Sequence, residues 1–151
     1  MPVEIKLLQN GEEYILANVA ADVFDNAVDK NLTTEFLADP RHHLAVALDN
    51  GQVVGMASGV HYVHPDKRPQ LFINEVAVAP AHRAAGVGKA LLGALLEEGR
   101  RLGCTEAWVL TDRDNRAAMR LYASLGGEEA TKDQVMFTFW LNSYCDPAGV
   151  P

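Results

Sequence analysis

The chain has 151 residues, of which 48% are hydrophobic, so it carries enough apolar material for one domain with a substantial core. Its formal net charge of −7 argues against a general nucleic-acid binder and suits either plain solubility or a cationic partner. No apolar run is long enough to cross a membrane, and we expect no secretory signal, because the N-terminal residues carry early acids and lack a continuous apolar stretch. Only two cysteines occur, far apart in the sequence, so we expect a cytoplasmic protein without a disulfide framework.

The first half of the chain predicts a strand, two helices and a hairpin, in that order. Apolar residues recur at helical spacing as far as Val23, and Pro40 stops the second, shorter helix. Asn50-Gly51 is the turn of the hairpin, because this pair readily adopts the positive φ values that a tight hairpin turn needs. The predicted elements are a strand at 3–8, a helix at 11–23, a helix at 31–37, and strands at 43–48 and 53–60.

The second half of the chain alternates strands and helices. Pro80 ends a short apolar strand, and Gly126-Gly127 stops the last helix. The predicted elements are a strand at 71–78, a helix at 88–102, a buried strand at 107–111, a helix at 116–125 and an alternating strand at 134–141. Residues 142–151 show no periodicity, so we expect a single domain at 1–141 followed by a flexible tail.

The order of these elements predicts the fold class. Strands joined by tight turns pair antiparallel, whereas two strands joined through a helix, here 71–78 and 107–111, pair in parallel. We therefore expect an α/β fold with a mixed, mostly antiparallel sheet and helices on both of its faces.

A glycine-containing turn links the strand at 71–78 to the helix that follows it. This turn has the sequence Arg83-x-x-Gly86-x-Gly88, and we call residues 83–88 the glycine loop. A strand, a glycine turn and a helix in succession present unpaired backbone N–H groups and the positive end of a helix dipole to an anion. The spacing is neither that of a nucleotide P-loop nor that of a dinucleotide fingerprint. The loop thus predicts a phosphate-bearing cofactor, with a plain tight turn as the alternative for the loop seen alone.

A second pattern lies in the helix at 116–125. It consists of Asn115, Ala118, Leu121, Tyr122 and Gly126. Together with the glycine loop, this pattern resembles the GNAT superfamily of N-acetyltransferases, and the element order matches that fold along nearly the whole chain. The resemblance implies acetyl-coenzyme A (acetyl-CoA) as cofactor, lying between two central parallel strands, 71–78 and 107–111, that splay apart at their ends.

The resemblance also implies roles for individual residues. Tyr122 is the candidate general acid for the departing thiolate, although a tyrosine at such a position is by itself commonly a core residue. Glu75, a lone acid in an apolar strand, is the candidate general base; the alternative is a sheet-face carboxylate paired with a cation, and a bulge would change the face it takes. The expected cofactor-binding residues are Val76, Ala77, Val78, Arg83, Ala84, Ala85, Gly86, Val87, Gly88, Lys89, Asn115, Ala118, Leu121 and Tyr122.

Residues 53–80 are most similar to the aminoglycoside 3-N-acetyltransferases of the gentamicin and fortimicin type. The shared features are Val53-Val54-Gly55, Tyr62-Val63-x-Pro65 and an acid followed by x-Ala77-Val78. Glu75 stands where that type has aspartate, and Asp112-Arg113-Asp114 departs from its loop. The implied acceptor is the 3-amino group of an aminoglycoside, and the implied role is antibiotic resistance or acetylation of another native amine.

An aminoglycoside is a polycation, so carboxylates are expected around its site. For each acid alone, a solvated or capping carboxylate is the alternative. The expected substrate-binding residues are Asp22, Phe24, Asp25, Asn74, Glu75, Asp112 and Asp114. A polyamine or amino-sugar acceptor, and a non-catalytic acyl-CoA-binding sensor, stay open, as does a homodimer through the last strand. His61-x-x-His64-x-Asp66 is interpreted as surface rather than as a metal site, and no nucleic-acid or membrane partner is expected.

Overall fold

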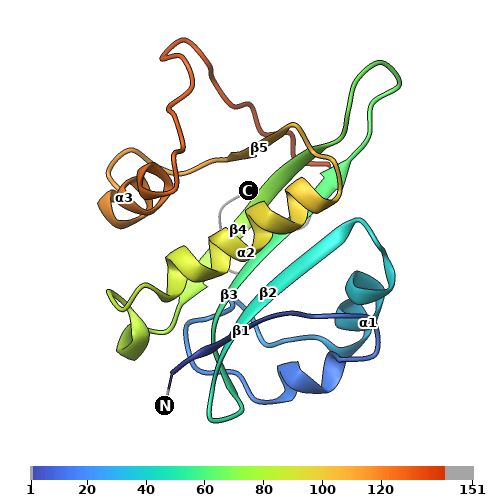
Figure 1. Cartoon of the computed structure of the whole chain (residues 1–151), viewed down its shortest axis with the longest axis vertical. Coiled ribbons are helices and arrows are strands. Elements are labelled where there is room, and N and C mark those ends of the chain that lie inside the picture. Colours follow the sequence, from blue (N-terminus) through green and yellow to red (C-terminus); the bar gives the residue numbers. More distant parts are fainter. Residues whose placement is uncertain (1, 142–151) are drawn as a thin grey trace.

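The computed structural model describes residues 2–141, in which five strands, three α-helices and two 3-10 turns follow one another (Figure 1). The elements are β1 (Glu4–Leu7), η1 (Glu13–Ala17), α1 (Lys30–Ala38), β2 (His42–Asp49), β3 (Gln52–Tyr62), β4 (Gln70–Val78), η2 (Pro80–His82), α2 (Val87–Arg101), β5 (Glu106–Val109) and α3 (Arg116–Ser124).

The strands form one sheet in the order β1-β2-β3-β4-β5. The first four pair antiparallel, and β5 pairs parallel to β4 because α2 carries the chain back across the sheet between them. This arrangement confirms the predicted mixed, mostly antiparallel sheet with one parallel pair.

Two irregularities in β4 shape the middle of the sheet. Gly59 of β3 lies opposite Ile73, but its neighbour Ser58 lies opposite Glu75, so Asn74 is an extra residue in β4. On the other side of β4, pairing with β5 ends at Ile73 and Val109. Within the described residues, β4 beyond Ile73 is therefore paired on its β3 side only, which is the predicted splay.

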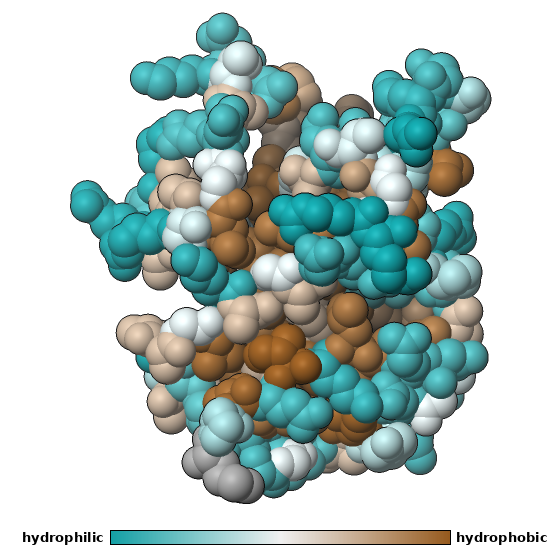
Figure 2. Space-filling view, viewed as in Figure 1, coloured by the Kyte–Doolittle hydropathy of each residue, from teal (hydrophilic) through white to brown (hydrophobic). Residues whose placement is uncertain are grey.

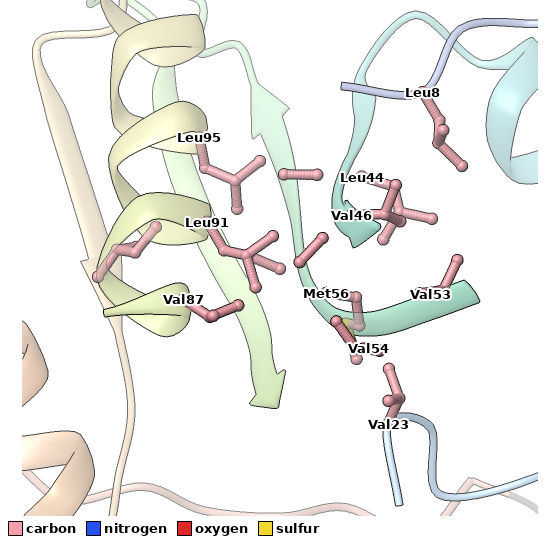
Figure 3. Packing of buried hydrophobic residues seen from close by; sticks show 14 of the residues in the cluster. Leu8, Val23, Leu44, Val46, Val53, Val54, Met56, Val87, Leu91 and Leu95 are labelled. Atoms are coloured by element: carbon pink, nitrogen blue, oxygen red, sulfur yellow. The ribbon is translucent and has the colours of Figure 1, made fainter. Parts of the chain in front are cut away.

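Helix α2 packs along one face of the middle strands and supplies much of the core (Figures 1 and 3). Val87, Leu91 and Leu95 point from one face of α2 toward the sheet, and the two leucines are fully buried. Gly55 of β3 permits this close approach, because a Cβ at that position would lie only 3.0 Å from Leu91 Cδ1. The buried apolar residues of η1 and α1, Leu16 and Leu37, belong to the same core.

The predicted helix at 11–23 is wrong in length, because only η1 forms there. Past η1 the chain straightens to run beside β3: the Val53 amide donates to the Asn18 carbonyl at 2.9 Å, and the Ala20 amide to the Val53 carbonyl at 2.8 Å. Asp22 then takes a positive φ of 64°, which a helix does not allow. Pairing with Val53 at the start of β3 thus outweighs the helical spacing of the apolar residues.

The predicted buried strand at 107–111 is instead a short edge strand. Among the strands of residues 2–141, β5 pairs with β4 alone, and Trp108 and Leu110 are 39% and 58% exposed. A cavity of about 280 Å³ lies between β5, α2 and α3. Figure 2 shows apolar side chains at the bottom of a hollow in the upper half of this face, where β5 and α3 lie in Figure 1.

The predicted strand at 134–141 does not form. These residues have neither helix nor strand, and their large apolar side chains are between 64% and 89% exposed. An alternating pattern indicates that one face of a segment can be buried, but a strand also needs a neighbouring strand to pair with. Residues 134–141 pair with no strand of the described chain. The predicted flexible tail at 142–151 lies outside the described residues.

Candidate active site

The glycine loop forms an open cradle of backbone amides at the start of α2. Strand β4 ends at Val78, η2 follows, and the Arg83 guanidinium donates back to the Val78 carbonyl at 2.9 Å. Ala84 and Gly86 both adopt positive φ values, 60° and 79°, which turn the chain into the helix. The amides of the first turn of α2 have no partner within the helix, so they are available to an anion.

A cavity of about 770 Å³ opens beside this loop, between the end of β4 and α3. Its lining consists of Val76, Ala77, Val78, His82, Arg83, Ala84, Gly86, Val87, Gly88, Lys89, Asn115, Ala117, Ala118, Arg120, Leu121, Tyr122 and Ser124. The structure thus brings together every expected cofactor-binding residue except Ala85. It adds four residues. His82 comes from η2, and the helical period of α3 places Ala117, Arg120 and Ser124 beside the residues of its pattern.

Helix α3 presents Tyr122 to this cavity. Asn115 caps the helix, since its side-chain oxygen accepts the Ala118 amide at 3.1 Å. Leu121 lies against the glycine loop, because a Cβ at Gly88 would lie 3.6 Å from Leu121 Cδ2. Burial raises the pKa of the Tyr122 hydroxyl, so the phenol stays protonated at neutral pH and can donate a proton.

A second cavity, of about 340 Å³, lies between β4, α1 and the segment before α1. Its lining consists of Leu16, Phe24, Asp25, Asn26, Ala27, Val28, Asp29, Leu32, Thr33, Phe36, Leu44, Ser58, Asn74 and Glu75. Four of the expected substrate-binding residues, Phe24, Asp25, Asn74 and Glu75, therefore meet here. We call this space the acceptor cavity and the larger one the cofactor cavity.

The other expected substrate-binding acids lie elsewhere. Asp22 lines a neighbouring hollow that shares Phe24 and Asp25 with the acceptor cavity. Asp112 and Asp114 line a separate hollow at the start of α3. The sequence predicts that these two acids follow β5, but it does not predict that they line a different hollow from Glu75.

Glu75 connects the two cavities through its place in β4. Its side chain lines the acceptor cavity, whereas the next residue, Val76, lines the cofactor cavity. Burial, and secondarily the Asp25 carboxylate, raises the pKa of Glu75 above that of an ordinary glutamate. A carboxylate of raised pKa is a stronger base, so this position suits removal of a proton from an amine.

The structure offers no competing metal centre or membrane span in the part that it describes. Within residues 2–141, no group of three or more His, Cys, Asp or Glu side chains is placed to hold a metal ion. His61 instead shares a hydrogen bond of 2.7 Å with His43. None of the described helices is both long and apolar enough to span a bilayer.

The chain is similar to known acetyltransferases in sequence and in structure. It is 29% identical over 112 residues to N-acetyltransferase 8 of Rattus norvegicus, covering 74% of this chain and 50% of that protein, so it spans half the length of this relative. It is 31% identical over 96 residues to the aminoglycoside N(6')-acetyltransferase type 1 of Salmonella typhimurium, covering 60% of this chain and 66% of that protein. The solved aminoglycoside acetyltransferase HMB0005, from an uncultured soil metagenomic sample, superposes with a TM-score of 0.78 at 24% identity, covering 94% of this chain and 100% of that one.

The family comparison covers both halves of the site. The model of the acetyltransferase (GNAT) family matches residues 12–126, a range that includes the glycine loop, Glu75 and Tyr122. The cofactor cavity also fits this family's cofactor, since a Cβ at Gly86 would meet no protein atom within 4 Å and the loop amides are left open to an anion. The chain therefore belongs to the acetyltransferase (GNAT) family, the N-acetyltransferases that use acetyl-CoA.

Proposed function

We propose that this chain transfers the acetyl group of acetyl-CoA to a primary amine of a cationic small molecule, directly and within a ternary complex. The observation that carries this proposal is the placement of two cavities on either side of β4, which meet at Glu75 and Val76. One cavity has an anion cradle and a protonated tyrosine, and the other has a half-buried carboxylate of raised pKa. The consecutive residues Glu75 and Val76 thus line the proposed amine site and the proposed acetyl-CoA site, respectively.

The chemistry assigns one task to each group. Bound acetyl-CoA supplies the acetyl group as a thioester. Glu75 takes the proton of the ammonium group, because an amine attacks only through a free lone pair. As the N–C bond formed and the C–S bond broke, Tyr122 would give its proton to the thiolate sulfur, and the second proton of the amine nitrogen, released as the amide formed, would return to Tyr122 through solvent. The Val76 amide would be a donor for the carbonyl oxygen.

The first acceptor to test is an aminoglycoside. The sequence resemblance names its 3-amino group, whereas the Salmonella relative is named for the N(6') position, so the acetylated nitrogen has to be measured. Asp25 and Glu75 in the acceptor cavity, and the net charge of −7, favour a cation. A polyamine or an amino-sugar is the second candidate, because the same two carboxylates suit any small amine.

We place this activity in the cytoplasm, in line with the scarcity of cysteines. The proposal requires no partner subunit, because residues of one chain line both cavities. A homodimer is therefore compatible with the mechanism but is not needed by it.

The experiment that tests this function measures thiol release from acetyl-CoA with gentamicin, sisomicin, fortimicin, spermidine and a lysine peptide. Rapid release with the aminoglycosides, with the product nitrogen located by NMR, supports the proposal and decides between the 3 and 6' positions. Release with spermidine alone keeps the mechanism and replaces the acceptor. Tight acetyl-CoA binding without release for any amine overturns the proposal in favour of an acyl-CoA sensor.

A further inference from the structure

The two ends of the acceptor cavity differ in chemistry. Polar groups gather where the amine would react: Ser58 and Glu75 come from neighbouring positions on β3 and β4, and Asp25 lies close enough to Glu75 to raise the pKa of its carboxyl. The opposite wall, formed by α1 and the residues before it, presents Val28, Leu32 and Phe36. We call Val28, Leu32 and Phe36 the apolar wall.

Two polar contacts beside the apolar wall are made within the first turn of α1. Asp29 Oδ1 accepts the Leu32 amide at 2.8 Å, and the Thr33 hydroxyl donates to the Asp29 carbonyl at 2.7 Å. Both contacts cap and stabilise the first turn of α1. Within α1 itself, the polar lining residue is Thr33, whose hydroxyl proton is thus engaged, while Leu32 and Phe36 offer a ligand hydroxyl no partner. The hydrogen-bonding capacity on this side lies before α1, at Asn26 and the second carboxylate oxygen of Asp29.

The apolar wall is also open to a ligand. Leu32 is 65% exposed and Val28 is 37% exposed, although both line the cavity. Large apolar side chains that stay exposed at the mouth of a site are typical of surfaces that a ligand covers. A hydroxyl group set against them would lose its water and gain no partner, whereas a bare carbon would gain contact area.

We infer that the acceptor, within the function proposed above, presents its reacting amine beside an oxygen-poor carbon surface. The carboxylates at the β4 end bind the ammonium group, and the apolar wall selects against hydroxyl groups next to it. Charge alone does not give this preference, since hydroxylated and deoxygenated amines of equal charge are attracted equally. Among aminoglycosides the substrate class is accordingly the deoxygenated one.

Kanamycin B, tobramycin and dibekacin form a matched series for the test. They carry the same amines, and they differ by the stepwise removal of two neighbouring hydroxyl groups from one amino-sugar ring. We expect kcat/KM to rise by about threefold or more at each removal, because each step takes away a hydroxyl that the wall leaves unpaired.

Leu32→Gln tests whether the apolar wall is the cause. The position is exposed, and glutamine is a good helix former, so α1 should remain intact. The variant should bring the dibekacin to kanamycin B ratio close to one by restoring hydrogen-bonding capacity. Val63→Gln is the control, since Val63 is 72% exposed and lines neither cavity, and it should leave the ratio unchanged.

The outcomes separate this inference from the function on which it rests. If the protein binds acetyl-CoA but acetylates none of the three aminoglycosides and no simple amine, both the inference and the proposed function are overturned. Turnover of all three with kanamycin B equal or preferred overturns the inference alone. A dibekacin preference that persists in Leu32→Gln also overturns it, because the selectivity would then arise elsewhere.

Discussion

Replacing Gly86 by alanine separates the role of the glycine loop in binding from its role in folding. Gly86 has a φ of +79°, and a Cβ there would meet no protein atom within 4 Å. Gly51, in the β2–β3 turn, has the same φ of +79° and the same open space. An alanine at either site is therefore strained without a clash, and each variant should lose about 1 kcal/mol of unfolding free energy.

Only one of these two glycines lines the cofactor cavity. For a domain of this length the loss of stability corresponds to a decrease in Tm of about 3 °C for both variants. In Gly86→Ala the added methyl group also projects into the space where the loop amides meet a phosphate, and loss of one charge-assisted hydrogen bond weakens binding by about tenfold or more. Gly51→Ala should bind acetyl-CoA with unchanged affinity.

Isothermal titration calorimetry with acetyl-CoA, together with thermal unfolding of both variants, measures the two effects. Equal losses of Tm with a selective loss of affinity in Gly86→Ala are the expected result. The reasoning is refuted if Gly86→Ala binds acetyl-CoA like the unmodified chain, or if both variants lose affinity equally. Either result would mean that the loop amides do not form the phosphate cradle.

Three further variants test the chemistry and the core. Tyr122→Phe should lower kcat by about a hundredfold, with the acetyl-CoA dissociation constant unchanged, because only the proton donor is lost. In the unmodified chain, activity should fall as the pH drops through the raised pKa of Glu75, because the protonated carboxyl cannot act as a base. Glu75→Gln should lower kcat and remove this acidic fall from the pH–rate profile. Because the pKa of Glu75 is raised in the folded state, its ionisation destabilises the fold as the pH rises through that pKa, so Glu75→Gln should also raise Tm at pH 8. Leu91→Ala should cost about 3 kcal/mol in urea unfolding, since the side chain is fully buried; a loss under 1 kcal/mol would contradict its place in the core.

The cofactor side of the site is the part that the sequence predicts best. The glycine loop and the pattern in α3 are local, since each lies within one turn and one helix, so residue spacing largely determines their geometry. Asn115 illustrates this, because a residue that reads as a helix cap does cap α3. Residues that lie far apart in sequence but share one cavity, such as Val78 and Tyr122, follow from the order of the elements.

The acceptor side depends on contacts that spacing does not encode. Asp25 and Asp112 are equally polar and both follow a predicted apolar element, yet only Asp25 reaches the cavity of Glu75. The contribution of α1 through Leu32 was not predicted, because an isolated exposed leucine is common on helices and carries no signal. Its meaning comes from the carboxylates that the sheet places opposite it.

The extra residue at Asn74 determines which cavity Glu75 serves. Leu71 faces α2, since a Cβ at Gly99 would lie 3.0 Å from Leu71 Cδ2, and Val78 faces the start of α2, 3.7 Å from a Cβ at Gly88. These two residues of β4 are an odd number of positions apart, so strict alternation would place them on opposite faces of the sheet. The bulge restores them to one face and so turns Glu75 to the other, toward the acceptor cavity. If β4 alternated strictly through these same residues, with Asn74 as a regular strand residue instead of a bulge, Glu75 would face the α2 side and Val76 the acceptor side, and the base would be separated from the proton that it has to remove.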